Sequence, residues 1–420
     1  SGPGLEASYR RMAGALAIAG AATGISLASG QGAWPLASAF ALAWLASPAV
    51  ASWASRPVAA GGRTPLGDAE AQSLRMIARR TWRYFEAFIT PADNALPPDN
   101  FQETPSPVLA HRTSPTNIGL YLLSVASARD FGWIGTLEAV ARLEDTLATA
   151  ARMQKHRGHL YNWYDTRDLR PLDPLYVSSV DSGNLAGHLI ALANTCREWR
   201  DQDLTQAQRR QGAADALDLV REEAGRLGGL GKMQSVSRRR LDLATERLAA
   251  SLAGPGDAGE HFAARLADIS EQAAIVADAV RDLVVEYHDE TGADLQFWAE
   301  AVGASLESHR RDLQERPAAP LAARLSELET LARSMAMSMD FSFLIDEDRM
   351  LLSIGYQLSE AALDPSCYDL LASEARLASF IAIAKGDAPA RHWFRLGRAQ
   401  APAAGGAALL SWSGSMFEYL

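Results

Sequence analysis

The longest uncharged stretch of this sequence lies near its beginning. Residues 12–55 contain no Asp, Glu, Lys, Arg or His. That length is sufficient for two bilayer spans of about 20 residues each. The segment Ser-Gly-Gln-Gly at 29–32 divides the stretch in the middle. We therefore expect two transmembrane helices, over residues 12–28 and 33–53.

The residues that flank this stretch predict its orientation. Arg10 and Arg11 precede it, and Arg56 and Arg63 follow it. Because positive charge favours the cytoplasmic side of a membrane, we expect both flanks, residues 1–11 included, in the cytosol. A signal peptide and a buried hairpin of a soluble protein are the alternatives, but a signal peptide leaves the second apolar run unexplained.

Composition limits the classes of protein that the chain can represent. Its 420 residues include 40 Lys and Arg against 50 Asp and Glu, so the formal net charge is −10. Nucleic acid is disfavoured as the main partner, since no surplus of positive charge is available to neutralise phosphates. Cys196 and Cys367 are too few for a disulfide scaffold. The chain begins on Ser1 rather than Met and ends without a polar tail, so we expect a piece of a longer protein.

The rest of the chain divides by composition. Residues 56–68 hold three Gly and two Pro and are predicted to be a linker. Residues 201–335 hold only four of the 32 aromatic residues and are dense in Ala, Leu, Arg and Glu, which is typical of long amphipathic helices. We interpret this block as a helical insertion or arm.

On either side of that block, helical periodicity alternates with loops rich in Trp, Tyr, Asp and Asn, and one strand hairpin is expected near residues 346–348. Paired helices with functional loops at one end are typical of an α/α toroid. We therefore expect a mainly α chain: an incomplete (α/α)6-toroid-like domain, its first part at 69–200 and its truncated continuation at 336–420.

Common cofactor motifs do not fit the sequence. His156 and His159 lie in a basic loop without carboxylate or Cys partners, which favours a solvated pair over a metal site. The glycine-rich segment 225–233 has one residue too many for a phosphate-binding loop, and Met233 stands where Ser or Thr is needed. We expect neither a metal nor a cofactor.

Aromatic and polar residues in the predicted loops indicate carbohydrate binding instead. Sugars bind to aromatic faces and to carboxylates and amides that bond their hydroxyls. Residues 161–165, Tyr-Asn-Trp-Tyr-Asp, combine all three types, although a packed loop plug has the same composition. Asp181 and Asn184 can cap the following helix and still face a cleft. The candidate substrate-binding residues are Tyr161, Trp163, Asp165, Asp181, Asn184, Glu374, Trp393 and Arg395. Glu374 has the alternative of an ion pair with Arg376 or Arg395, and Trp393 and Arg395 that of ordinary packing.

Glu418 is the candidate catalytic residue. It follows small residues and sits in an apolar run, 416–420. Apolar surroundings disfavour a charged carboxylate and raise its pKa toward the range of a general acid. The alternative is an ordinary surface carboxylate.

Several separated segments together resemble a known family. They are residues 113–121, 161–165, 179–185, 373–377, 392–398 and 414–418. In this order they are similar to cyclic β-1,2-glucan synthase, specifically to its middle, glucoamylase-like region and the membrane hairpin before it. The similarity covers nearly the whole chain, and the block 201–335 is its least specific part.

The resemblance implies a multi-pass enzyme of the bacterial inner membrane with its soluble region in the cytosol. A flanking glycosyltransferase domain builds linear β-1,2-glucan from UDP-glucose, the middle region cyclises it by retaining transglycosylation, and a phosphorylase-like domain trims it. The implied partners are β-1,2-glucan, membrane lipid and the two flanking domains. Glu418 corresponds to the acid/base, and its partner nucleophile is implied to lie beyond Leu420. The alternatives are an endo-β-1,2-glucanase and a non-catalytic, membrane-anchored scaffold that holds glucan.

Overall fold

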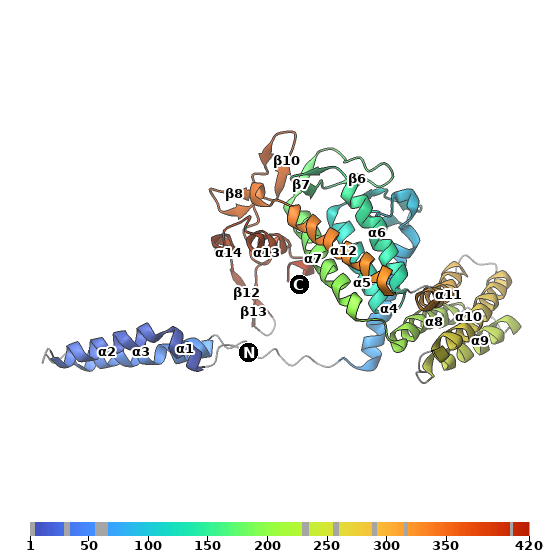
Figure 1. The fold of residues 1–420 in the computed structure, drawn as a ribbon, viewed down its shortest axis with the longest axis horizontal. Helices are drawn as coiled ribbons and strands as arrows, with labels where there is room; N and C mark the ends of the chain where they lie inside the picture. Colours follow the sequence, from blue (N-terminus) through green and yellow to red (C-terminus); the bar gives the residue numbers. More distant parts are fainter. Residues whose placement is uncertain are drawn as a thin grey trace. The chain divides into compact units, whose positions relative to one another are not determined.

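The computed structural model describes residues 5–28, 34–54, 66–228, 235–254, 260–287, 292–314, 318–403 and 406–419. Within them the chain is mainly helical (Figure 1). It divides into two units, residues 1–71 and 72–420. The segment 29–32, predicted to divide the two apolar helices, and most of the predicted linker 56–68 lie outside the described residues.

The smaller unit contains helices α1 (Leu5–Arg11), α2 (Ala13–Ala28) and α3 (Trp34–Ala54). Helices α2 and α3 pack against each other. Ala15 and Ala19 of α2 and Ala41 of α3 are buried. Larger apolar side chains such as Ile25 and Leu42 are exposed. The small residues therefore permit close approach of the two helices.

The predicted transmembrane hairpin is wrong. Among the described residues, no helix combines the length and the apolar character needed to cross a bilayer. Helix α2 has 16 residues, which span only about 24 Å, against a hydrocarbon core of about 30 Å. Helix α3 has 21 residues, but many of them are Ala or Ser, and Pro48 lies inside it. Absence of charge was therefore a poor measure of apolarity. None of the described helices supports the expected multi-pass topology.

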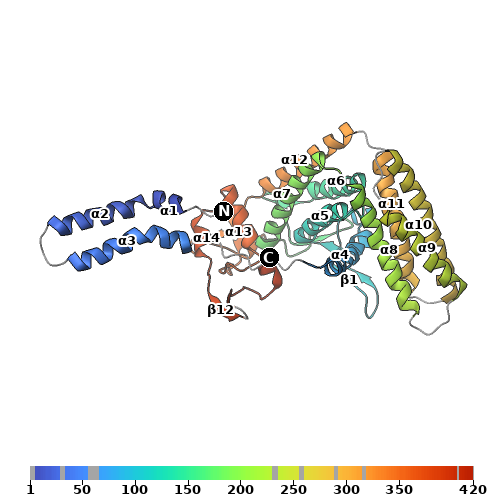
Figure 2. The same ribbon diagram turned by 90° about the horizontal axis from the view of Figure 1, so that it is seen from below.

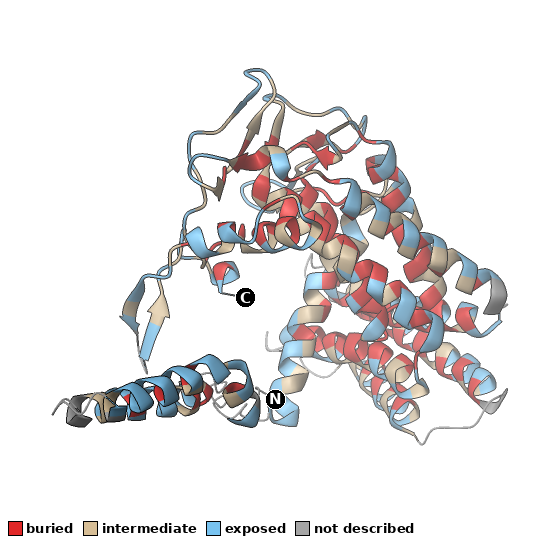
Figure 3. Cartoon of the chain, turned by 60° about the vertical axis from the view of Figure 1, so that its left-hand side comes forward, coloured by how far each residue is buried: buried red, intermediate tan, exposed pale blue. Residues whose placement is uncertain are grey.

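The larger unit begins with helices that surround α7 (Ser179–Asp201). Helix α7 packs against α5 (Pro115–Asp130), α12 (Ala318–Ser338) and α13 (Arg376–Lys385), and α6 (Thr136–Arg152) packs against both α5 and α12. Helix α4 (Asp68–Phe88) adds Trp82, whose ring stacks on Tyr121 at a centroid distance of 6.5 Å. The buried residues, red in Figure 3, follow the faces along which these helices meet. The predicted mainly helical character is confirmed, whereas the membrane hairpin expected before the toroid-like domain is contradicted. The helices of this unit pack around α7.

Short antiparallel strands lie in the loops between these helices. The pairs are β1 (Phe101–Gln102) with β2 (Val108–Leu109), β3 (Arg112–Thr113) with β6 (Tyr164–Asp165), β4 (Lys155–His156) with β5 (His159–Leu160), β8 (Ile345–Asp346) with β9 (Leu351–Leu352), and β12 (Gln400–Ala403) with β13 (Gly406–Leu409). Strand β10 (Gly355–Gln357) lies between β7 (Tyr176–Ser178) and β11 (Ala362–Leu363), with Tyr356 opposite Val177. The hairpin predicted near residue 346 is confirmed, but the loops contain more strands than the sequence indicated.

Helices α8 (Gln206–Gly228), α9 (Val236–Ala253), α10 (Glu260–Tyr287) and α11 (Gly292–Gln314) enclose a second core (Figure 2). Leu217, Leu248, Ile269 and Val302 are among its fully buried members. The described residues of the block 201–335 are therefore mostly helical with buried apolar faces, as the composition indicated. Its interpretation as a separate arm stays a prediction.

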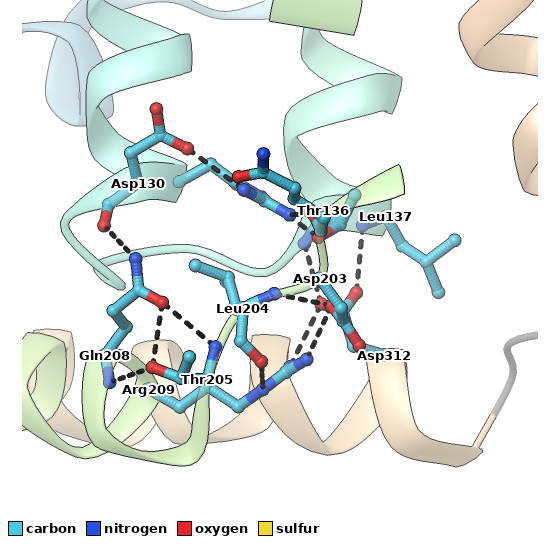
Figure 4. A network of polar contacts seen from close by, with 11 residues as sticks. Asp130, Thr136, Leu137, Asp203, Leu204, Thr205, Gln208, Arg209 and Asp312 are labelled. Atoms are coloured by element: carbon cyan, nitrogen blue, oxygen red, sulfur yellow. Dashed lines mark hydrogen bonds and ion pairs between the residues drawn. The ribbon is translucent and has the colours of Figure 1, made fainter. Parts of the chain in front are cut away.

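A buried polar network joins this helical bundle to α6 (Figure 4). Asp312 of α11 accepts hydrogen bonds from the backbone N–H groups of Thr136 at 2.7 Å and Leu137 at 2.9 Å. The first N–H groups of a helix have no partner within the helix, and a negative charge there is favourable. Arg209 of α8 pairs with the same carboxylate at 3.3 Å. Asp312 thus acts as the cap of α6 from a distant part of the chain.

Candidate functional site

A cavity lies between α5, α7 and the segments that follow residue 370. Its volume is about 640 Å³. Asn184 of α7, Glu374 of the loop before α13, and Trp393 of α14 (Arg391–Arg395) line it. Three of the eight predicted substrate-binding residues, from three separate motifs, therefore meet at one cavity. Its lining is completed by Thr116, Leu120, His188, Ser373, Arg376, Leu377, Phe380 and Phe417.

Local sequence determines how α5 reaches the cavity. Ser114 precedes the helix and its hydroxyl accepts a hydrogen bond from the N–H of Asn117 at 3.1 Å, while Pro115 occupies the first turn. Both features are typical of a helix start. This cap fixes the first turn of α5 and so places Thr116 in the cavity wall.

Two glycines of α7 allow α13 to lie close to it. A Cβ added at Gly183 would lie 2.4 Å from the Cβ of Ala378, and one at Gly187 would lie 2.7 Å from a methyl carbon of Leu377. Real side chains do not tolerate such distances. The residues that follow these glycines, Asn184 and His188, are four apart and share one helix face. The close packing of α7 and α13 thus brings that face opposite Glu374.

Asp181 does not cap α7. The cap is Ser178, whose hydroxyl accepts from the N–H of Asp181 at 3.2 Å. The carboxylate of Asp181 instead accepts from the amide of Asn162 at 3.0 Å, with the amide orientation assigned from the hydrogen-bond network. The amide oxygen of Asn162 accepts from Nε1 of Trp163 at 3.1 Å. Asn162 therefore links two of the predicted residues.

Two carboxylates among the predicted site residues also affect the pKa of Tyr368. Burial, followed by the negative charges of Asp181 and Glu374, raises the pKa of Tyr368 to about 12. The Tyr368 hydroxyl is consequently neutral at physiological pH. Its response to both carboxylates indicates that Asp181 belongs to the same electrostatic environment as Glu374, although Asp181 does not line the cavity.

Glu418 is buried, with 1% of its surface exposed, in the short helix η3 (Met416–Glu418). Its carboxylate accepts from the N–H groups of Ser413 at 2.8 Å, Gly414 at 2.7 Å and Ser415 at 3.0 Å. Gly414 adopts a φ of +82°, which favours glycine and turns the chain. Phe417, the residue before Glu418, lines the cavity.

The predicted rise in the pKa of Glu418 is wrong. Burial does favour the neutral acid, but hydrogen bonds from the N–H groups of Ser413 and Ser415, the hydroxyl of Ser411 and the N–H of Gly414 outweigh it and lower the pKa. The surroundings are apolar in sequence, whereas the groups that touch the carboxylate are backbone donors. The Glu418 carboxylate is therefore ionised and works as a local cap.

Besides Asp181, four predicted residues do not line the cavity. Tyr161 is 3% exposed and belongs to the helical core. Asp165 pairs with Arg167 at 2.9 Å, and the hydrogen bond from Arg167 lowers the Asp165 pKa to about 2. Arg395 is exposed at the end of α14. Trp163 does not line the cavity either, and the guanidinium of Arg112 lies 4.7 Å from its ring centroid.

His188 is the main residue that the sequence reasoning missed. It lines the cavity, and burial lowers its pKa, so its imidazole is neutral at pH 7. The signal was available, because His188 follows Asn184 by four residues and both come directly after a glycine.

The histidine pair of the basic loop has a different role from the predicted one. His159 is fully buried, bonding the hydroxyl of Ser182 at 2.8 Å and the carbonyl of Asp340 at 2.8 Å, so it is not solvated. His156 stacks on Tyr356. Within the described ranges, no group of three or more His, Cys, Asp or Glu side chains is arranged to hold a metal ion.

Comparison with known proteins finds one informative relative. No protein-family model matches the chain. The chain is 49% identical over 387 residues to the cyclic beta-(1,2)-glucan synthase NdvB of Rhizobium meliloti (strain 1021). The match covers 91% of this chain but 14% of the relative, so the chain spans about one seventh of that protein's length. The resemblance indicated by the separated sequence motifs is thereby confirmed.

Proposed function

We propose that this chain, a segment of a cyclic β-1,2-glucan synthase, binds β-1,2-glucan in the cavity between α5, α7 and α13 during ring closure. The observation that carries the proposal is the meeting of Asn184, Glu374 and Trp393 at this cavity. They come from three separate motifs. The chain is 49% identical to a segment of a protein named for cyclic glucan synthesis.

The chemistry of the lining suits a glucosyl unit. The rings of Trp393 and Phe417 offer apolar faces to the C–H surface of a sugar. The amide of Asn184 and the carboxylate of Glu374 can bond hydroxyl groups, which both donate and accept. The volume of about 640 Å³ falls within the usual range for small-molecule sites, about 300–1,000 Å³. One or more glucosyl units therefore fit.

In the proposed reaction, glucan is cyclised by retaining transglycosylation. Glu418 protonates the leaving glycosidic oxygen, and later accepts the proton of the hydroxyl at the other end of the same glucan. Such a mechanism also needs a second carboxylate as nucleophile. For Glu418 to act as an acid, it must first lose the hydrogen bonds from residues 413–415, since these stabilise its ionised form.

A second candidate function is glucan binding without catalysis. The position of Glu418 favours it, because the carboxylate is buried, ionised and engaged by three backbone N–H groups. In this alternative Glu374 and Asn184 hold the glucan, and the chemistry occurs on another part of the complete protein.

Product analysis distinguishes the candidates. The complete protein is incubated with purified linear β-1,2-glucan, and the products are separated by chromatography and identified by mass. Cyclic products support transglycosylation, whereas short linear products indicate an endo-β-1,2-glucanase. Glu418→Gln abolishes ring formation if Glu418 is the acid/base. Unchanged ring formation removes Glu418 from the mechanism, and Glu347→Gln in an exposed turn serves as the control.

A further inference from the structure

His188 carries an unsatisfied nitrogen at the edge of the cavity. Its Nδ1 atom is buried and has no hydrogen-bond partner among the residues that the structure describes. Nearly all buried polar groups in proteins have a partner, so an exception needs an explanation. Neither the sequence motifs nor the proposed roles of Asn184 and Glu374 account for this residue.

Gly119 of α5 explains where the unsatisfied nitrogen lies. A Cβ added at Gly119 would be 2.4 Å from Nδ1 of His188 and 3.1 Å from its Cγ. The Nδ1 edge of the imidazole therefore rests directly on the backbone of α5, in a space that only glycine leaves open. The opposite edge, with Nε2, is the part of the ring left to line the cavity.

This packing selects one tautomer. Burial keeps the imidazole neutral, so one ring nitrogen carries the hydrogen and the other a lone pair. A hydrogen on Nδ1 would point at Gly119, where no acceptor lies, and orphaned buried N–H groups are rarer than orphaned acceptors. The hydrogen therefore belongs on Nε2, where a group in the cavity can accept it.

We infer that His188 donates a hydrogen bond from Nε2 to a hydroxyl oxygen of the glucosyl unit in the cavity. This donor determines which hydroxyl group of the sugar binds at that position. This inference rests on the proposed function. A sugar hydroxyl donates one hydrogen bond and accepts others. The carboxylate of Glu374 accepts only, and the neutral Nε2–H of His188 donates only, so the two complement each other across one cavity.

Substitutions at His188 test the inference through binding. The probe is a purified linear β-1,2-glucan oligosaccharide, titrated into the complete protein by calorimetry under conditions without turnover. His188→Leu removes the donor but keeps an apolar side chain, and should weaken binding about tenfold. His188→Gln restores an N–H donor, and should recover most of the affinity. A purely structural role would instead leave affinity unchanged while the melting temperature falls in both variants.

Gly119 supplies an independent test in which His188 itself is not substituted. Gly119→Ala puts a methyl group against Nδ1 and should weaken binding as much as His188→Leu. In a His188→Ala background the same change should have little further effect, because the ring that it displaces is gone. Full additivity of the two changes overturns the inference.

Failure of the proposed function and failure of the inference about His188 give different binding results. If the unaltered protein does not bind linear β-1,2-glucan, the proposed function fails and the role of His188 with it. If the unaltered protein binds and His188→Leu binds equally well, only the inference about His188 fails.

Discussion

Glu374 accepts a hydrogen bond from the hydroxyl of Ser415 at 3.2 Å. The N–H of the same serine bonds the carboxylate of Glu418 at 3.0 Å. The carboxylate in the cavity wall is thus tied, through one residue, to the carboxylate that the sequence predicts to be catalytic. A ligand that replaces the hydrogen bond from Ser415 to Glu374 would therefore act on a residue that also bonds Glu418.

Glu374→Gln should weaken the binding of linear β-1,2-glucan about tenfold. The substitution removes the charge that strengthens hydrogen bonds to sugar hydroxyls, and a charged acceptor is worth roughly 1.5–3 kcal/mol. The amide oxygen of Gln can still accept from Ser415, so the loop should be preserved. Calorimetric titration measures the affinity. Glu360→Gln, at an exposed position, is the matched control, and equal affinities in the two variants would exclude Glu374 from the site.

Hydrogen exchange should report the cap that Glu418 provides. The amides of Ser413, Gly414 and Ser415 donate to its carboxylate, so they should exchange slowly in the unaltered protein and faster in Glu418→Gln.

The contribution of Glu418 to the stability of the folded protein should also depend on pH. The pKa of Glu418 is lower in the folded state than in the unfolded state. The contribution is therefore present above the unfolded pKa and is lost as pH falls through the lower, folded value.

The measurement is mass spectrometry of peptides that cover residues 411–419, corrected for the intrinsic pH dependence of exchange. Peptides from α7 provide the reference, since Glu418 makes no bond to that helix among the contacts described. Equal protection of residues 413–415 in both proteins would show that the carboxylate does not hold this loop.

Local rules succeeded where neighbours in sequence decide the structure. The predicted hairpin at Asp346 depends on residues within a few positions of each other. The environment of Glu418 is also local, but the sequence suggested an apolar one. It is the backbone turn at Gly414, invisible in composition, that aims three N–H groups at the carboxylate.

Longer-range errors have other physical causes. Helix α3 was predicted to span a membrane because it carries no charge. Many of its residues are Ala or Ser, which are only weakly apolar or polar, so the helix is not apolar enough to cross a bilayer. Tyr161 was selected for its type, but its burial is set by the packing of helices that are remote in sequence. Asn184 lies at the cavity, and its functional role stays a prediction. The spacing of His188 from Asn184 was visible in the sequence, but the contact of His188 with Gly119 joins two helices and was not.

Gly183→Ala should disrupt the cavity by separating α7 from α13. The new Cβ would lie 2.4 Å from the Cβ of Ala378 and 2.6 Å from its Cα, so backbone would have to move. We expect a loss of about 1–3 kcal/mol, typical of overpacking, together with weaker glucan binding. Gly303→Ala in α11 is the matched control, because nothing lies within 4 Å of its added Cβ. There Ala should be neutral or stabilising by up to about 1 kcal/mol.

Thermal denaturation of the two variants measures this contrast. A melting temperature of Gly183→Ala at or above that of Gly303→Ala would mean that the close approach of α7 and α13 is not required.

His159 should make stability depend on pH between about 6.5 and 4. Burial is the main cause that lowers its pKa to about 4, from an ordinary value of 6.5. The unfolded chain therefore binds a proton at this histidine at pH values where the folded chain does not. The stabilisation is full above pH 6.5 and is lost as pH falls to about 4, at a cost of roughly 3 kcal/mol. His309 has a pKa of about 4 for the same reason and should add a similar loss.

His159→Gln isolates the contribution of His159, because an amide can still donate to the carbonyl of Asp340 but does not titrate. The variant should be less stable than the unaltered protein at pH 7, and the gap in melting temperature should narrow as pH falls toward 4. A gap that stays constant over this range would mean that His159 binds its proton equally well in the folded and unfolded states. The complete burial of His159 argues against that outcome, because a charged imidazole there would lose its hydration.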